Sequence, residues 1–203
     1  MASSERDERR RGAFREYVRS IVADRFVFVD ECSTNIALSP IFARAPKGER
    51  AFGKAPRNWG KNVSLICAID AGGVKPSMSV EGAVDARAFE GYVEHFLTPK
   101  LKRGQIVVMD NLSVHKSAWA RELVEAEGAE AEGAEVLLLP PYSPDFNPIE
   151  EAFSKVKSVL RRAKARTLAA LFEATHSAHG SVSAQDVRGF FGDCGYRPPM
   201  QSM

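Results

Sequence analysis

Short apolar runs recur along the chain, and each one ends at a turn or at an acidic residue. The clearest are "RFVFVDE" from Arg25, "QIVVMDN" from Gln105 and "EVLLLPP" from Glu135. Runs of about four apolar residues without alternation are typical of strands buried on both faces of a sheet. Between the first two runs, "NVSLICAID", a Gly-Gly turn and "VKPSMSVEG" predict a β-hairpin.

Apolar residues spaced by three and four predict helices between these strands. Asp85 is a suitable N-cap for "DARAFEGYVEHFLTPKL", and a second helix is expected from about Lys116 to Glu127. Asn147 as N-cap and Pro148 at the first helical position predict a helix in "NPIEEAFSKVKSVLRRAKA". Right-handed crossovers would place the three buried strands side by side and parallel. The pattern therefore predicts an α/β fold, a mixed five-stranded sheet with the hairpin at one edge and helices on its faces.

The segments outside this pattern complete one domain of ordinary size. The 203 residues are enough to bury a real core. We expect residues 1–24 to form an N-terminal arm or linker helix and residues 25–203 to form the main domain. Within that domain, residues 32–61 are expected to make a long basic excursion, and short helices within 167–191 to close the chain.

Composition narrows the class of protein only in part. The net charge of +2 does not by itself indicate a nucleic-acid partner, although basic residues cluster in the excursion and in residues 152–166. The three cysteines lack CxxC spacing, which favours reduced thiols and a cytoplasmic protein. No apolar run approaches the roughly 20 residues of a membrane span, so no membrane partner is expected.

Two aspartates follow neighbouring buried strands. Asp30 and Asp110 should meet at the carboxyl edge of the sheet, where active sites of α/β proteins form. Each alone is explained as well by a turn or a helix cap. Together they would repel without a cation, whereas Mg²⁺ or Mn²⁺ would hold both, and a second ion would suit phosphoryl transfer.

A third carboxylate is expected close to these two. The candidates are Asp145, Glu150 and Glu151. At 100° per residue, Glu150 lies beside the apolar stripe of its helix, whereas Glu151 points nearly opposite to it. A capping-box role also explains Glu150, and a turn explains Asp145 without excluding it from the site.

Three stretches resemble the catalytic region of one family. "FVFVDE", "VVMDNLSVHK" and "PPYSPDFNPIEEAFSKVK" are similar to bacterial insertion-sequence transposases of the Tc/mariner superfamily. This resemblance implies an RNase H-like fold and DNA transposition by hydrolysis at element ends followed by strand transfer. It implies two Mg²⁺ ions, with Mn²⁺ as a substitute, and a location on the nucleoid of a bacterial cell. The catalytic and metal-binding triad would be Asp30, Asp110 and Glu150.

The spacing of the triad departs from the family. Members commonly have 34 residues between the second and third acids, whereas residues 111 to 149 number 39. If 34 residues are counted after Asp110, the third acid would be Asp145. However, residues 126–135 read "AEGAEAEGAE", and removing one copy of these five residues restores 34 before Glu150. We therefore expect a duplication at the far end of the sheet, where a longer connection costs little.

The start of the chain is the second departure. Family members carry helix-turn-helix DNA-binding modules before the catalytic domain, and fewer than 30 residues precede Asp30 here. Double-stranded DNA, both element ends and target, is the expected partner, with a homodimer and an upstream-frame helix-turn-helix protein as candidate protein partners. The alternatives are another RNase H-like nuclease, or a catalytically silent remnant that binds DNA or a partner transposase.

Basic residues near the expected site are candidates for DNA contacts. In each case a solvated loop or helix face is the competing explanation. Trp59 in the excursion could stack on a base, although packing against the sheet is the stronger expectation. The candidate DNA-binding residues are Arg50, Lys54, Arg57, Lys61, Lys157 and Arg161.

Overall fold

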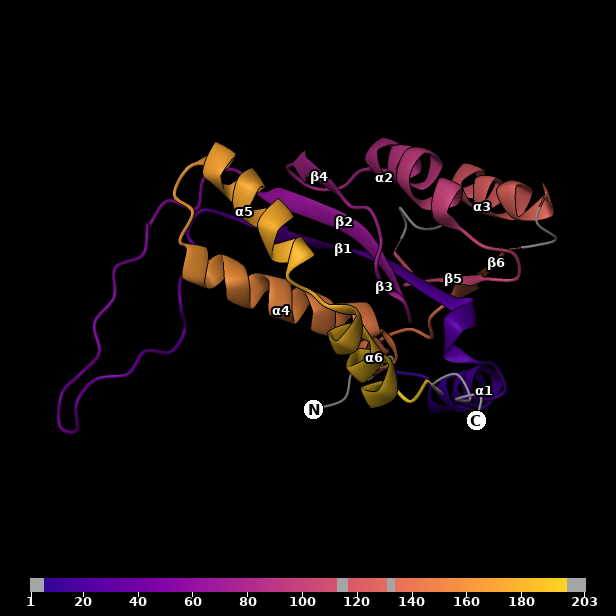
Figure 1. Ribbon diagram of the computed structural model, residues 1–203, viewed down its shortest axis with the longest axis horizontal. Helices are drawn as coiled ribbons and strands as arrows, with labels where there is room; N and C mark the ends of the chain where they lie inside the picture. Colours follow the sequence, from indigo (N-terminus) through magenta and orange to yellow (C-terminus); the bar gives the residue numbers. More distant parts are fainter. Residues whose placement is uncertain (1–5, 113–116, 131–133, 197–203) are drawn as a thin grey trace.

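A single mixed sheet runs through the molecule (Figure 1). The computed structural model describes residues 6–112, 117–130 and 134–196. Over these residues the sheet has six strands in the order β3-β2-β1-β5-β6, with β4 also paired to β2. The strands are β1 (Phe26–Thr34), β2 (Val63–Asp70), β3 (Gly73–Val74), β4 (Met78–Glu81), β5 (Ile106–Met109) and β6 (Glu135–Leu138).

The strand directions agree with the expected mixed sheet. β1, β5 and β6 are parallel neighbours, and β2 runs antiparallel to β1. The count differs from the expected five because the return arm of the hairpin is split into β3 and β4, which both pair with β2. Pro76 lies between them, and a proline cannot donate a hydrogen bond to a ladder.

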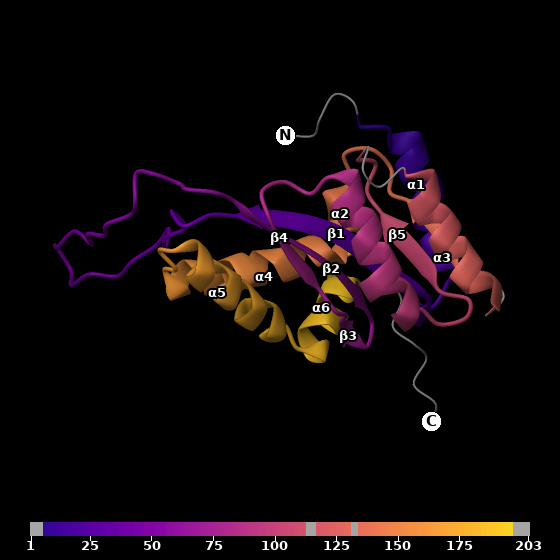
Figure 2. The same ribbon diagram turned by 90° about the horizontal axis from the view of Figure 1, so that it is seen from above.

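Helices cover both faces of the sheet, so that three layers result (Figures 1 and 2). Alternate residues of β1 explain why its apolar run is continuous. Phe26 and Phe28 pack in the core on the side of α4, α5 and α6, and Val27 and Val29 pack on the side of α2 and α3. The helices are α1 (Glu8–Arg19), α2 (Ala86–Tyr92), α3 (Ala118–Glu130), α4 (Pro148–Ala163), α5 (Leu168–Gly180) and α6 (Ala184–Asp193). A π-helical turn (Val93–Leu97) extends α2, and short 3₁₀ turns cover Ala23–Arg25, Thr98–Lys100 and Pro144–Phe146.

Within the expected N-terminal arm or linker helix, residues Glu8–Arg19 form α1, which packs on the core. Phe14 and Val18 are buried in the same cluster as the apolar face of α4. Arg11 is also buried, with 1% of its surface exposed. The N-terminal helix is therefore joined to the part of the molecule that leads into α4.

The duplicated block lies at the end of the sheet away from the ends of β5 and β6. Its first copy forms the last residues of α3, and Glu135 at its end begins β6 opposite Ile106, the first residue of β5. Residues 131–133 of the block, and Lys116 at the expected helix start, lie outside the described residues. The position of the described part agrees with an insertion remote from Asp110.

The excursion between β1 and β2 covers residues 35–62, not 32–61, because β1 continues to Thr34. It projects from the body of the molecule (Figures 1 and 2). Its base is tied down, because the Arg166 guanidinium donates to the carbonyls of Ile36 (2.5 Å) and Leu38 (2.9 Å). The expectation that Trp59 packs on the sheet is wrong, since 68% of its surface is exposed. Phe42 and Phe52 are still more exposed, at 85% and 89%.

Candidate active site

The sheet opens where β5 ends but β1 continues. β1 pairs with β5 only over Phe26–Phe28, and then remains paired with β2 up to Thr34. Asp30 therefore lies inside a strand, not after its end as the sequence suggested, because β2 continues the ladder on the other side. The last residue of β5 is Met109, so Asp110 follows at the level where the β5 side of β1 is uncovered.

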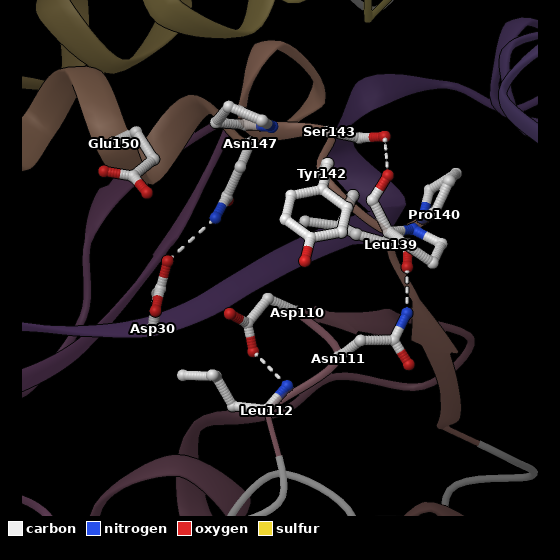
Figure 3. Close-up of a pocket in the computed structure, with 12 residues that line it drawn as sticks. Asp30, Asp110, Asn111, Leu112, Leu139, Pro140, Tyr142, Ser143, Asn147 and Glu150 are labelled. Carbon is white, nitrogen blue, oxygen red and sulfur yellow. Dashed lines mark hydrogen bonds between the residues drawn. The ribbon is translucent and has the colours of Figure 1, made fainter. Parts of the chain in front are cut away.

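A pocket of about 400 Å³ occupies this opening (Figure 3). Asp30, Asp110 and Glu150 all line it, from β1, from the end of β5 and from the first turn of α4. One Asp110 oxygen accepts the Leu112 amide at 2.8 Å, so the turn role expected of a lone aspartate is also present. The structure thus brings the three predicted acids to one pocket; their catalytic role stays a prediction.

Asp30 is the most buried of the three acids, with 6% of its surface exposed. Its carboxylate accepts the Glu31 amide at 2.8 Å and the Asn147 side-chain amide at 2.9 Å. Burial raises the pKa of Asp30 to about 7, and the charges of Asp110 and Glu150 add to this effect. Burial of this carboxyl therefore disfavours its anionic form unless a cation lies beside it.

The sequence assigned Asn147 a different role. It was expected to cap α4, but its side chain makes no cap hydrogen bond and donates to Asp30 instead. The one available signal was the residue type, since the Asn side chain carries an N–H donor that can reach a carboxylate, which an ionised Asp at the same cap position lacks. Asn147 is buried, so it holds the Asp30 carboxylate in a fixed direction.

The three candidates for the third acid point to three different places. Glu150 is exposed and faces the pocket. Glu151 is turned toward the end of α6, where its carboxylate is 3.9 Å from the Cys194 thiol. Asp145 forms a two-pronged ion pair with the Arg11 guanidinium, at 3.0 and 2.6 Å, which lowers the pKa of Asp145. Neither Asp145 nor Glu151 lines the pocket.

Residues 139–147 form the wall of the pocket opposite β1, and we call them the pinned segment. Asn111 donates to the Leu139 carbonyl at 2.5 Å, which fastens the start of this segment to the end of β5. At its other end the Phe146 ring stacks on Phe14 at 5.4 Å, and the Phe146 carbonyl accepts the Tyr196 hydroxyl at 2.7 Å. Contacts from α1 and from the C-terminal region therefore fix the residues that precede Glu150.

The donor set of the pocket fits a hard divalent cation. Asp30, Asp110 and Glu150 offer carboxylate oxygens, which Mg²⁺ and Mn²⁺ prefer. Among the residues that the structure describes, no three acidic, histidine or cysteine side chains are already grouped closely enough to hold one ion. Glu150 is exposed on the first turn of α4 and lines the same pocket as the two aspartates.

The predicted DNA-binding residues fall into two groups. Lys157 and Arg161 lie on α4 and line a groove of about 450 Å³ together with Trp59 of the excursion. Lys157 is seven residues after Glu150, or about 10 Å along the helix axis. The others lie on the excursion away from the pocket: Arg50, Lys54 and Arg57 are exposed, and Lys61 forms an ion pair with Glu81.

Comparison with known proteins agrees with this architecture. Residues 25–171 match the family described as "DDE superfamily endonuclease". No curated protein matches the chain. Among solved structures, the "Mos1 transposase paired-end complex with left transposon end" has a TM-score of 0.75 and 19% identity, covering 96% of this chain and 61% of that chain. The "Mos1 transposase catalytic domain and Raltegravir with Mg" has a TM-score of 0.68 and 18% identity, covering 93% and 90%.

These likenesses confirm the RNase H-like fold expected from the sequence. The chain spans about three fifths of the Mos1 chains in the DNA complexes, and nearly the whole length of the catalytic-domain structure. Within the described residues, no helix has the length and apolar character needed to cross a membrane.

Proposed function

Because the chain belongs to the DDE superfamily of endonucleases, we propose that it is the catalytic domain of a Tc/mariner-type transposase. It would hydrolyse phosphodiester bonds at element ends and join the freed 3′-hydroxyl to target DNA. The observation that carries this proposal is the pocket lined by Asp30, Asp110 and Glu150 from three separate elements. Structures of Mos1 complexes with a transposon end and after strand transfer support it.

Asp30, Asp110 and Glu150 would hold two Mg²⁺ or Mn²⁺ ions. Bound there, the ions supply charge stabilisation for the attacking and leaving oxygens of the phosphodiester. Mos1 structures with Mg and with Mn support divalent metal use. The raised pKa of Asp30 gives a reason within this chain, because a cation beside the carboxylate relieves the cost of its charge.

Other residues of the chain would position the acids. Asn147 holds the Asp30 carboxylate through its side-chain amide. The ion pair of Asp145 with Arg11 fixes the turn that precedes α4, and thereby the direction from which Glu150 enters the pocket. These are positioning roles, since neither Asn147 nor Asp145 would touch the reacting atoms.

DNA would run from the pocket along α4. Lys157 and Arg161 share the flank of the helix that bears Glu150, and their spacing is suited to successive phosphates of one strand. The exposed cations Arg50, Lys54 and Arg57 would bind the backbone farther out, on the excursion. Lys61 is the weakest member of the set, because Glu81 already neutralises it.

The test of the proposal is nicking of supercoiled plasmid by the full chain in Mg²⁺ or Mn²⁺. Wild type is expected to nick, and Glu150→Gln to nick at least about 10³-fold more slowly, as expected when a group that stabilises transition-state charge is lost. Glu151→Gln is the matched control, since this neighbour does not line the pocket. Equal loss in both variants, or no metal-dependent nicking by wild type, would refute the assignment.

A second assay separates transposition from cleavage alone. A labelled duplex with a free 3′-hydroxyl is incubated with a target plasmid and Mg²⁺, and covalent joining is measured. Joined product supports a transposase; nicks without joining favour another RNase H-like nuclease. A silent remnant would give neither product.

The cellular location and the protein partners are part of the same proposal. We place it on bacterial DNA, in the cytoplasm at the nucleoid, within an insertion sequence. A homodimer and an upstream-frame protein with helix-turn-helix modules are proposed partners that would supply specificity for the element ends.

A further inference from the structure

Tyr142 has a left-handed backbone conformation that no helix end accounts for. Among the described residues, only Tyr142 (φ 53°) and Lys164 (φ 51°) are non-glycine residues with positive φ. Lys164 ends α4, where a left-handed residue is common. Tyr142 follows no helix, and its Cβ makes this region of backbone space unfavourable. A strained residue beside a functional pocket points to a role for its side chain.

The pinned segment forces Tyr142 into this conformation. Pro141 precedes it, and the Ser143 hydroxyl donates to the Pro141 carbonyl at 3.1 Å. The Phe146 amide donates to the Ser143 carbonyl at 3.0 Å, and the Asp145 ion pair with Arg11 follows immediately. The backbone on both sides is therefore held in place, and Tyr142 is presented from a rigid support.

The Tyr142 ring is placed over the pocket of the three acids. It lines that pocket, and Figure 3 shows its hydroxyl directed toward the space beside Asp110. The ring is not buried by the protein, since 58% of the residue's surface is exposed. A large apolar face is thus kept in solvent next to carboxylates, where only a bound molecule would cover it.

We propose that Tyr142 is a stacking platform for the nucleobase at the reacting 3′ end. This inference rests on the proposed function and adds a contact to the base, whereas the three acids act on the phosphodiester. Aromatic rings stack on any base through its face, so the contact needs no particular sequence. Tyr142 would hold the terminal nucleotide so that its 3′-oxygen stays in the pocket.

The test is photo-crosslinking of the full chain to a duplex that carries 5-iodo-deoxyuridine at one 3′ terminus. Ca²⁺ replaces Mg²⁺, because it binds oxygen ligands and allows complex formation to be studied without turnover. A second duplex carries the same base ten positions inward. Crosslinks are mapped by mass spectrometry, and affinity is measured by fluorescence anisotropy.

The expected result is a crosslink at Tyr142 with the terminal base and none there with the inward base. Tyr142→Phe should keep the crosslink and the affinity, because it keeps the ring. Tyr142→Gly should lose the crosslink and bind the end about tenfold more weakly, as the loss of one stacked base predicts. This variant should be at least as heat-stable as wild type, because glycine adopts positive φ freely. Tyr17→Ala, which removes an exposed tyrosine of α1, should change neither readout.

Two results would overturn the inference: no terminal crosslink at Tyr142 in wild type, or unchanged affinity and crosslinking yield in Tyr142→Gly. The proposed function is judged separately, by plasmid nicking in Mg²⁺. Nicking without the crosslink refutes only the stacking role. A terminal crosslink without nicking supports stacking of Tyr142 on a DNA end, but it refutes the catalytic proposal and with it the role at a reacting 3′ end.

Discussion

Two connections border the candidate site, and the protein holds them in opposite ways. The pinned segment, residues 139–147, is fastened by a buried arginine, a stacked ring and a tyrosine hydroxyl. The excursion, residues 35–62, is tied at its base by Arg166 and beyond that exposes Phe42, Phe52 and Trp59. The first connection leads directly into Glu150, and the second carries most of the candidate DNA-binding cations.

The difference in how the two connections are held corresponds to two requirements of the proposed site: precise positioning of metal ligands and adaptable contacts to DNA. Metal ligands must be held within a fraction of an ångström of their working positions, so the residues before Glu150 need many fixed contacts. Backbone contacts to DNA tolerate movement, because attraction to phosphates depends on charge more than on direction. Substitutions that remove one of the contacts fixing the pinned segment should therefore affect stability, and those of exposed cations in the excursion should affect DNA binding alone.

The largest effect on stability is expected at Asp30, which the pinned segment holds through Asn147. Its pKa is about 7 in the folded protein and 3.8 ordinarily, so the folded state retains a proton that the unfolded chain loses between these values. Without metal, the free energy of unfolding should fall as pH rises from about 4 to 7, by at most about 4 kcal/mol. Asp30→Asn cannot ionise and should escape this fall.

The measurement is the melting temperature with a chelator at pH 4.5 and at pH 8. The difference between Asp30→Asn and wild type should increase by several degrees from the lower to the higher pH. Asp24→Asn, on an exposed turn, is the control and should show no such increase. A difference for Asp30→Asn that does not depend on pH would contradict the prediction.

A smaller effect is expected at the ion pair of the pinned segment. Asp145→Asn should lower the free energy of unfolding by about 2 kcal/mol, because the buried Arg11 loses its two-pronged partner and keeps only the longer contact to Glu8, at 3.6 Å. Half of the Asp145 side chain is exposed, so the cost should be less than for a fully buried pair. Urea denaturation measures the change.

Arg15→Met on the same helix is the control for this pair. Arg15 is exposed, and its guanidinium lies 5.2 Å from the centre of the Phe146 ring, so its loss should cost little. Per folded molecule, Asp145→Asn should still nick plasmid. If Asp145→Asn folds but is inactive while Glu150→Gln still nicks plasmid, Asp145 is the third acid and the assignment of Glu150 is wrong.

The smallest effect on stability is expected in the excursion. Replacement of Arg50, Lys54 and Arg57 by alanine should change the free energy of unfolding by less than about 0.5 kcal/mol, because all three are exposed. DNA affinity should become less dependent on salt, with the slope of log K against log salt reduced by about 0.9 for each lost phosphate contact. An unchanged slope would remove the excursion from the DNA interface.

Much of the fold could be predicted because each layer leaves a local pattern. The continuous apolar run of β1 reflects burial on two faces, and the stripe from Ile149 to Leu160 reflects one buried face of α4. The split of the hairpin into β3 and β4 was missed, although Pro76 marked the interruption. The exposure of Trp59 was missed because an exposed aromatic ring has the same local sequence as a buried one.

For the candidate site, the sequence predicted which acidic residues line the pocket, but not which residues bind to them. Asp30, Asp110 and Glu150 could be placed at one edge because strand order and helix periodicity determine where those positions lie. The partners of the acids could not. Arg11 and Asp145 are 134 residues apart, and the bond from Asn147 to Asp30 spans 117 residues, so neither leaves a local signal.

The length of helix α4 sets the distance between the candidate site and the base of the excursion. It is a single helix of 16 residues, about 24 Å long, with Glu150 in its first turn. Its other end is followed closely by Arg166, which grips the base of the excursion. From Glu150 to the end of the helix is about 20 Å, so for DNA lying along α4 as proposed, the phosphodiester at the pocket and the base of the excursion would be about six base pairs apart.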